Sequence, residues 1–150
     1  MSSRPRSAAG PGGATPGVLE PAARRRRRLG LAGLLGGAAA AHVALPQPFE
    51  AMVPAWVPGS PRVWNLATAV AEAGAATLLV RRRTSHLGGW IAAGTFCVVG
   101  VANVQAVVDG GMSALPGRLS TRCAAVVRLP LQLPLIWWSW QVARRPWPQG

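Results

Sequence analysis

The stretch that decides the fold is LGGWIAAGTFCVVGVANVQAVV, residues 87–108, which contains no charged side chain. A helix rises ~1.5 Å per residue, so about 20 apolar residues cross the ~30 Å hydrocarbon core of a bilayer. Comparable runs lie at 29–45, 64–80 and 123–143, the first two shorter and rich in alanine and glycine. The pattern predicts an all-α protein whose membrane domain, residues 29–145, is a four-helix transmembrane bundle.

Charge is segregated between these runs. All 16 basic residues are arginine, and the formal net charge is +12. Arginines cluster at 24–28, 81–83 and 144–145, whereas the other two loops carry only Arg62, Arg118 and Arg122. Cytoplasmic loops of membrane proteins are enriched in basic residues, so we expect a multi-pass protein of the plasma (inner) membrane with both termini in the cytoplasm. Because the clusters abut apolar runs, nucleic acid is not an expected partner.

The basic N-terminal region has a competing interpretation. The sequence from Arg24 to Ala44 also resembles a signal peptide, with a basic start, an apolar centre and small residues at the end. Since three further apolar runs follow, we expect an uncleaved first helix instead. Residues 1–28, rich in Gly, Pro, Ser and Arg, are predicted to be a disordered basic cytoplasmic tail, and residues 146–150 a short C-terminal tail.

A proline-rich segment, residues 46–62, separates the first two runs. Its five prolines prevent a continuous helix. Phe49 and Trp56, with Pro54 and Pro58 between and after them, are typical of a segment lying at the outer membrane interface, where tryptophan gathers. An ordinary interfacial loop would have the same composition.

Polar side chains interrupt the apolar runs, and all are expected in the outer half of the bilayer, at depths of ~5 to ~14 Å. They are His42, Glu72, Asn103, Arg128 and Gln132. Arg128 and Gln132 are four residues apart and share one helix face, and Pro130 and Pro134 free two nearby carbonyls. Charged groups at such depth are costly, so they should be paired inside the bundle.

Two interpretations of this cluster stay open. In the structural one, Glu72 and Arg128 form an internal ion pair, completed by the two amides, and His42 is a helix-end cap. In the functional one, a small pocket open to the outer face handles a quinone head group, a small anion or a proton. No metal site is predicted. Cys97 and Cys123 differ in depth by ~16 Å, too far for a disulfide, and are expected to be buried.

The order of the motifs resembles the DoxX-like family of small integral membrane proteins. The motifs are AHVALPQPFEAMVPAWVP, AEAG, VANV and RLPLQLPLIWW, spread over about residues 29–142. The resemblance implies a four-helix membrane fold and adds Pro130 to the residues of interest. Most such proteins look like small membrane proteins without assigned chemistry.

These observations predict an accessory or structural membrane subunit that is not an enzyme on its own. The alternative is the membrane subunit of a quinone-linked oxidoreductase, in which Arg128 and Gln132 orient a quinone oxygen and Glu72 accepts a proton. A third hypothesis is a small transporter or channel formed by an oligomer. The lipid bilayer is the expected partner, together with a redox or other membrane protein or further copies of the chain; a quinone is the one cofactor considered.

Overall fold

The chain is all-helical in the computed structural model, which describes residues 20–111, 117 and 121–144. The helices are α1 (Ala22–Ala44), α2 (Pro46–Glu50), α3 (Pro61–Val80), α4 (Ser85–Val108) and α5 (Arg122–Ala143). Within the described residues no strand occurs, and Gly111 and Thr121 form an isolated bridge. The expectation of an all-α protein is therefore confirmed.

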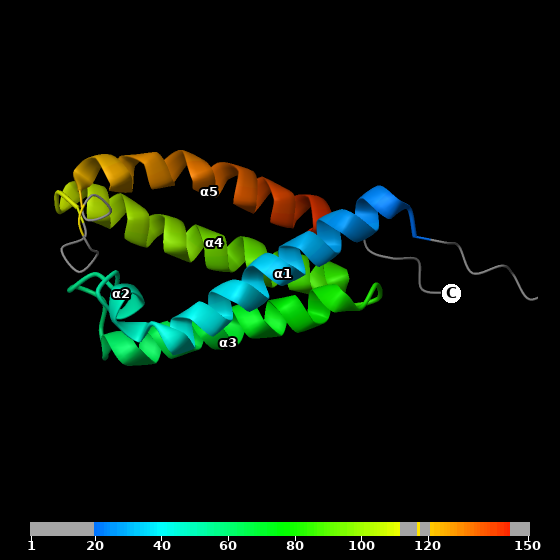
Figure 1. The fold of residues 1–150 in the computed structure, drawn as a ribbon, viewed down its shortest axis with the longest axis horizontal. Helices are drawn as coiled ribbons and strands as arrows, with labels where there is room; N and C mark the ends of the chain where they lie inside the picture. The colour runs from blue at the N-terminus through cyan, green and yellow to red at the C-terminus, as the bar shows by residue number, and fades with distance from the viewer. Residues whose placement is uncertain (1–19, 112–116, 118–120, 145–150) are drawn as a thin grey trace, which may run out of the picture.

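The four long helices form two pairs (Figure 1). α1 packs along α3, and α4 packs along α5. The α3–α4 contact joins the pairs, whereas α5 has no extended contact with α3. The short α2 and the segment after it lie at one end of the bundle, against the end of α1 and the start of α3. The opposite end holds the start of α1 and the α3–α4 turn.

The helix boundaries differ from the expected runs mainly in α1, which begins at Ala22 and so includes arginines 24–28. Arginine is a good helix former, and Arg28 is buried rather than part of a solvated tail. Residues 1–19 and 146–150 of the expected tails lie outside the described residues. α5 continues as one helix through Pro130 and Pro134.

Small residues bring the helices close together in the half of the bundle that holds the arginines. A Cβ at Gly88 would lie 2.8 Å from the Ala75 carbonyl oxygen, and one at Gly89 would lie 2.7 Å from the Ala143 backbone nitrogen. The apolar core occupies the same half and is formed by Leu31, Ala32, Leu35, Ala75, Leu79, Ala92 and Phe96. Glycine at these two positions therefore sets the α3–α4 and α4–α5 distances.

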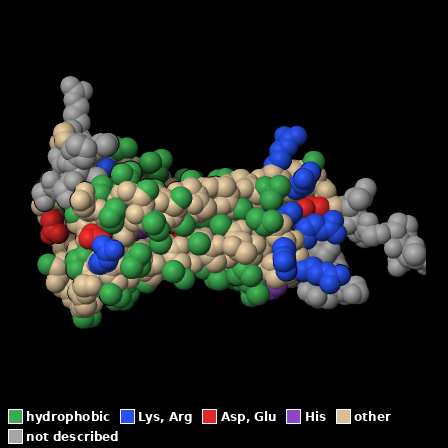
Figure 2. All heavy atoms as spheres, turned by 60° about the horizontal axis from the view of Figure 1, so that its bottom comes forward, with side chains coloured by type: hydrophobic (Ala, Val, Ile, Leu, Met, Phe, Trp, Pro, Cys, Tyr) green, Lys and Arg blue, Asp and Glu red, His purple; other side chains and the backbone are tan. Residues whose placement is uncertain are grey.

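The surface separates charge from apolar side chains (Figure 2). Arginines gather at the end where α1 begins, a mixture of acidic and basic residues lies at the α2 end, and apolar side chains lie between them. α3 and α4 are long and apolar enough to cross a membrane. By itself, a pair of such helices is a weak indication of a membrane location.

Candidate functional site

The polar centre of the molecule is a hydrogen-bonded pair between α1 and α3. His42 Nδ1 lies 2.5 Å from Asn65 Oδ1, and Asn65 Nδ2 donates to the His42 carbonyl oxygen at 3.1 Å. Both residues are buried. Because the amide nitrogen of Asn65 faces the carbonyl, its oxygen faces the ring, so His42 Nδ1 is the donor in the first bond.

Glu72 completes this arrangement. It lies on the same face of α3 as Asn65, seven residues further along the helix. Its Oε2 lies 3.6 Å from His42 Nε2, which is an ion-pair distance but longer than a hydrogen bond. Since Nδ1 faces Asn65, Nε2 is the ring nitrogen that faces the Glu72 carboxyl group.

His42 was expected to cap its helix, and the structure gives it a different role. The backbone nitrogen of Leu45 bonds to the Ala41 carbonyl at the end of α1, and the His42 ring turns inward. The Phe49 ring of α2 stacks on it, with 3.9 Å between ring centroids and a 30° tilt. α2 thus covers the imidazole, and the proline-rich segment contributes directly to the site.

The other expected cluster members come from α4 and α5. Asn103 and Gln132 are buried, and Arg128 is half-buried. The ion-pair partner that the structure gives Glu72 is His42 on the adjacent α1, and not Arg128 on α5. His42, Asn103 and Arg128 lie in the half of the bundle that ends at α2, whereas Glu72 and Gln132 lie near the middle of their helices.

Two buried oxygens in this region have no hydrogen-bond donor among the described residues: Glu72 Oε2 and Asn103 Oδ1. Both side chains are at least nine-tenths buried. A buried acceptor without a donor costs about 1–3 kcal/mol. The two atoms are therefore the places where a hydrogen-bond-donating group would be stabilised.

The expected interfacial segment folds against α4. Trp56 Nε1 donates to Gln105 Oε1 at 3.3 Å, and Trp64 Nε1 donates to the exposed Pro58 carbonyl oxygen at 2.7 Å. A pocket of about 430 Å³ lies between this segment, including Pro54, and the last turns of α4 near Asp109. The two tryptophans fix the segment across the end of the bundle.

A second buried polar group lies at the opposite end and was not expected from the sequence. Arg28 pairs with Glu20 at 2.9 Å, and its Nη1 donates to the carbonyl oxygens of Leu79 (2.6 Å) and Val80. The hydrogen bond from Arg28 lowers the pKa of Glu20 below its ordinary value of 4.5. Arg28 therefore satisfies carbonyls that the end of α3 leaves without intrahelical partners.

Asn65 was also missed, although its spacing of seven from Glu72 places both on one helix face. The expectation of buried cysteines is wrong, because Cys97 and Cys123 are both exposed free thiols. In the described part of the chain, no three His, Cys, Asp or Glu residues lie close enough together to hold a metal ion.

The chain belongs to the family described as a domain of unknown function, DUF8561, which it matches over residues 31–143. The matched region includes His42, Asn65 and Glu72 and begins after the buried Arg28. No curated protein and no solved structure matches the chain.

Proposed function

We propose that this chain is a multi-pass plasma-membrane protein in which α1, α3, α4 and α5 all cross the bilayer. The distribution of exposed apolar side chains supports this arrangement. Leu34, Val70, Val98 and Leu133, one on each long helix, are 43%, 72%, 66% and 70% exposed. A helix that crosses a bilayer turns such side chains toward the lipid, which supports a spanning position for all four long helices.

The proposed orientation places both termini in the cytoplasm. Arginines 24–28 in the first turns of α1, 81–83 in the α3–α4 turn and 144 after α5 lie at one end of the bundle, whereas the α2 end carries Asp109 and a Glu50–Arg62 ion pair. The positive-inside rule assigns the arginine-rich end to the cytoplasm and α2 to the outer face. The proline-rich segment then covers the outer end of the bundle. We also propose the relationship to DoxX-like proteins that the sequence motifs suggest.

Within this frame the chain acts as an accessory or structural subunit rather than as an enzyme. The observation that carries this role is the His42–Asn65–Glu72 arrangement, whose polar atoms are turned toward one another across the α1–α3 contact. Buried polar side chains that pair across two helices favour that helix pairing whether or not they also act on a ligand.

The two exposed cysteines test the membrane arrangement directly. Cys123 lies in the first turn of α5, at the α2 end, whereas Cys97 lies twelve residues inside α4, ~18 Å from its start. In intact cells a membrane-impermeant maleimide should label Cys123 and leave Cys97 unlabelled. Single variants, Cys97→Ser and Cys123→Ser, assign each signal, and denaturing detergent should expose both thiols.

Two outcomes would contradict the arrangement. Rapid labelling of Cys97 in intact membranes would show that α4 is not embedded in lipid. Labelling of Cys123 only after the cytoplasmic face is opened would reverse the orientation while leaving the embedding intact.

The second candidate function is the membrane subunit of a quinone-linked oxidoreductase. It is favoured by the unsatisfied oxygens Glu72 Oε2 and Asn103 Oδ1, which would accept hydrogen bonds from the hydroxyls of a hydroquinone. Oxidation would pass two electrons to the partner redox subunit and release two protons, and the Glu72 carboxylate would accept one of them.

Two substitutions at Glu72 separate the candidates. Glu72→Gln can still donate to His42 Nε2, whereas Glu72→Leu leaves that nitrogen buried without a partner. If the role is structural, the Gln variant should fold normally, the Leu variant should lose folded yield, and quinol-dependent electron flux in membrane vesicles should not depend on either. Loss of flux in a normally folded Gln variant would support the oxidoreductase subunit and refute the purely structural role.

A further inference from the structure

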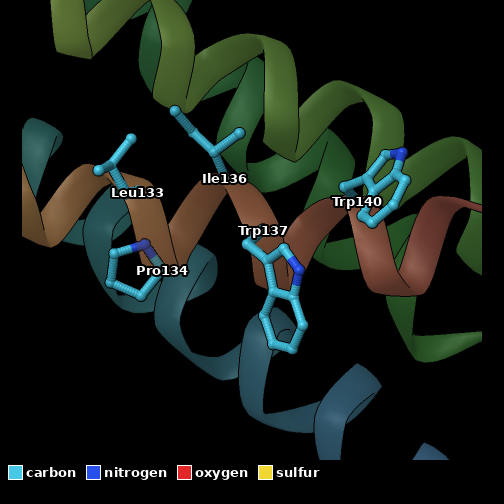
Figure 3. Close-up of a pocket in the computed structure, with 5 residues that line it drawn as sticks. All are labelled: Leu133, Pro134, Ile136, Trp137 and Trp140. Carbon is cyan, nitrogen blue, oxygen red and sulfur yellow. The ribbon is translucent and has the colours of Figure 1, made fainter.

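α5 carries a shallow apolar groove on its outer surface, away from the His42–Glu72 pair. The groove has a volume of about 630 Å³ and is lined by Leu133, Pro134, Ile136, Trp137 and Trp140. Figure 3 shows these five side chains projecting from successive turns of α5. No polar side chain is among them, so the groove suits a hydrocarbon occupant.

One end of the groove is basic. Arg144 lies over the Trp140 ring, with its guanidinium carbon 4.2 Å from the ring centroid, and is exposed beyond it. Trp138 Nε1 donates to the Arg27 carbonyl at 3.1 Å, which brings the start of α1 beside the same turn of α5. The apolar groove thus leads to the exposed Arg144 guanidinium, and the start of α1, which carries the exposed Arg27, lies beside the same turn.

The wider surroundings repeat this charge. Arginines 81–83 occupy the α3–α4 turn at the same end, because Gly89 at the start of α4 packs on Ala143 at the end of α5. The buried Arg28 is occupied by Glu20 and by backbone carbonyls, so it is not available to an external anion. Arg144 donates to Gln141 Oε1, which is a neutral partner, so the charge of Arg144 is not neutralised at the end of the groove.

The distance from Arg144 to the inner end of the groove matches one membrane leaflet. Leu133 precedes Arg144 by eleven residues, or ~16 Å along the helix, which is about half of a ~30 Å hydrocarbon core. An acyl chain starting at the arginine level would therefore run along the groove to the middle of the bilayer.

We propose that this groove binds one anionic phospholipid of the leaflet at the arginine-rich end, with its phosphate at Arg144 and Arg27 and an acyl chain against Trp137 and Leu133. The proposal rests on the membrane position proposed above. A second copy of the chain in the same orientation is a poorer occupant, because it would bring two arginine-rich ends together. The lipid phosphate instead neutralises them, and the tryptophans lie at the depth that tryptophan prefers.

Native mass spectrometry of the purified full chain tests the proposal. The protein is extracted in mild detergent and offered equal amounts of phosphatidylglycerol, which is anionic, and phosphatidylcholine, which is not. We expect one retained phosphatidylglycerol per chain, and Arg144→Gln should weaken its retention about five-fold. Trp137→Ala should weaken the retention of both lipids, because it removes part of the apolar wall of the groove and no charge. Arg62→Gln, an equal loss of charge at the α2 end, is the matched control and should change nothing.

Equal retention of the two lipids by the natural chain, or equal effects of Arg144→Gln and Arg62→Gln, would overturn the proposal. So would a dimer that forms without bound lipid, because it would identify a second copy as the occupant. Alkaline extraction of membranes containing each variant separates this proposal from the previous one. If the protein stays in the membrane but shows no lipid preference, only the proposal of a lipid in the groove is refuted. If the protein is released by alkaline extraction, the proposed membrane position is refuted.

Discussion

The two helix pairs are held together by different physical means. α1 and α3 are joined by buried polar groups, with Arg28 on the α3 carbonyls at one end and His42 on Asn65 and Glu72 toward the other. α4 and α5 are joined by close backbone packing, in which Gly89 admits Ala143. Small residues and interhelical hydrogen bonds are both recognised ways to pair helices where lipid removes the hydrophobic drive. Among the contacts described above, buried polar groups join α1 to α3 and a close glycine–alanine contact joins α4 to α5.

The largest effect is expected when the polar contact of α1 and α3 is broken at Arg28. Arg28→Ala removes the partner of the buried Glu20 and of two α3 carbonyls, and removing one member of a buried ion pair costs about 3–5 kcal/mol. A large fall in the thermal midpoint of the detergent-solubilised protein checks this. Arg26→Ala, at an exposed position of the same cluster, should leave the midpoint almost unchanged. Equal midpoints for the two variants would mean that Arg28 does not join the helices.

The packing of α4 and α5 is tested by adding a single methyl group. Gly89→Ala would place a Cβ 2.7 Å from backbone nitrogen of Ala143, which cannot move independently of its helix. Overpacking of this kind costs about 3 kcal/mol when backbone must shift. Gly94→Ala is the control on the same helix, since its Cβ would meet nothing within 4 Å and alanine favours the helix. If Gly89→Ala were as stable as Gly94→Ala, close packing would not define this pair.

A smaller loss is expected at Asn65. Asn65→Ala removes both hydrogen bonds to His42 and leaves the imidazole donor and a carbonyl buried, at a cost of about 2 kcal/mol. Thr68→Ala, one turn further along α3, removes an exposed hydroxyl bonded only to its own helix and should cost much less. Thermal midpoints of the two variants measured side by side decide whether the His42–Asn65 contact stabilises the pair.

The smallest effect is a change in the acid dependence of stability. In the folded protein Arg28 lowers the pKa of Glu20 below its unfolded value of 4.5. The stabilisation that Glu20 contributes to the folded state is therefore complete above pH 4.5 and is lost as the pH falls through the lower, folded pKa. The thermal midpoint of the natural chain should therefore decrease as the pH is lowered below about 4.5. The Glu20→Gln variant should show a smaller decrease over the same pH range. An unchanged acid slope in Glu20→Gln would show that the ion pair contributes little.

Sequence patterns located the helices because length and hydropathy are local properties. Residues 64–80, 87–108 and 123–143 agree closely with α3, α4 and α5. The partner of Glu72 could not be obtained in this way, since it depends on which helices are neighbours, and α3 packs on α1 and α4 but not extensively on α5. Arg28 looked like part of a solvated cluster because four identical residues precede it, and only the position of the α3 carbonyls distinguishes it.

The Arg28 contact also lies entirely within the part of the chain that is synthesised first. Every residue that joins α1 to α3, from Glu20 to Val80, precedes α4 in the sequence and is therefore made before it. The first pair can therefore close while the second is still being made. The second pair depends on Ala143, the last residue of α5, which must reach Gly89 near the start of α4. A ribosome that stops a few residues early would leave a closed first pair beside an unclosed second one.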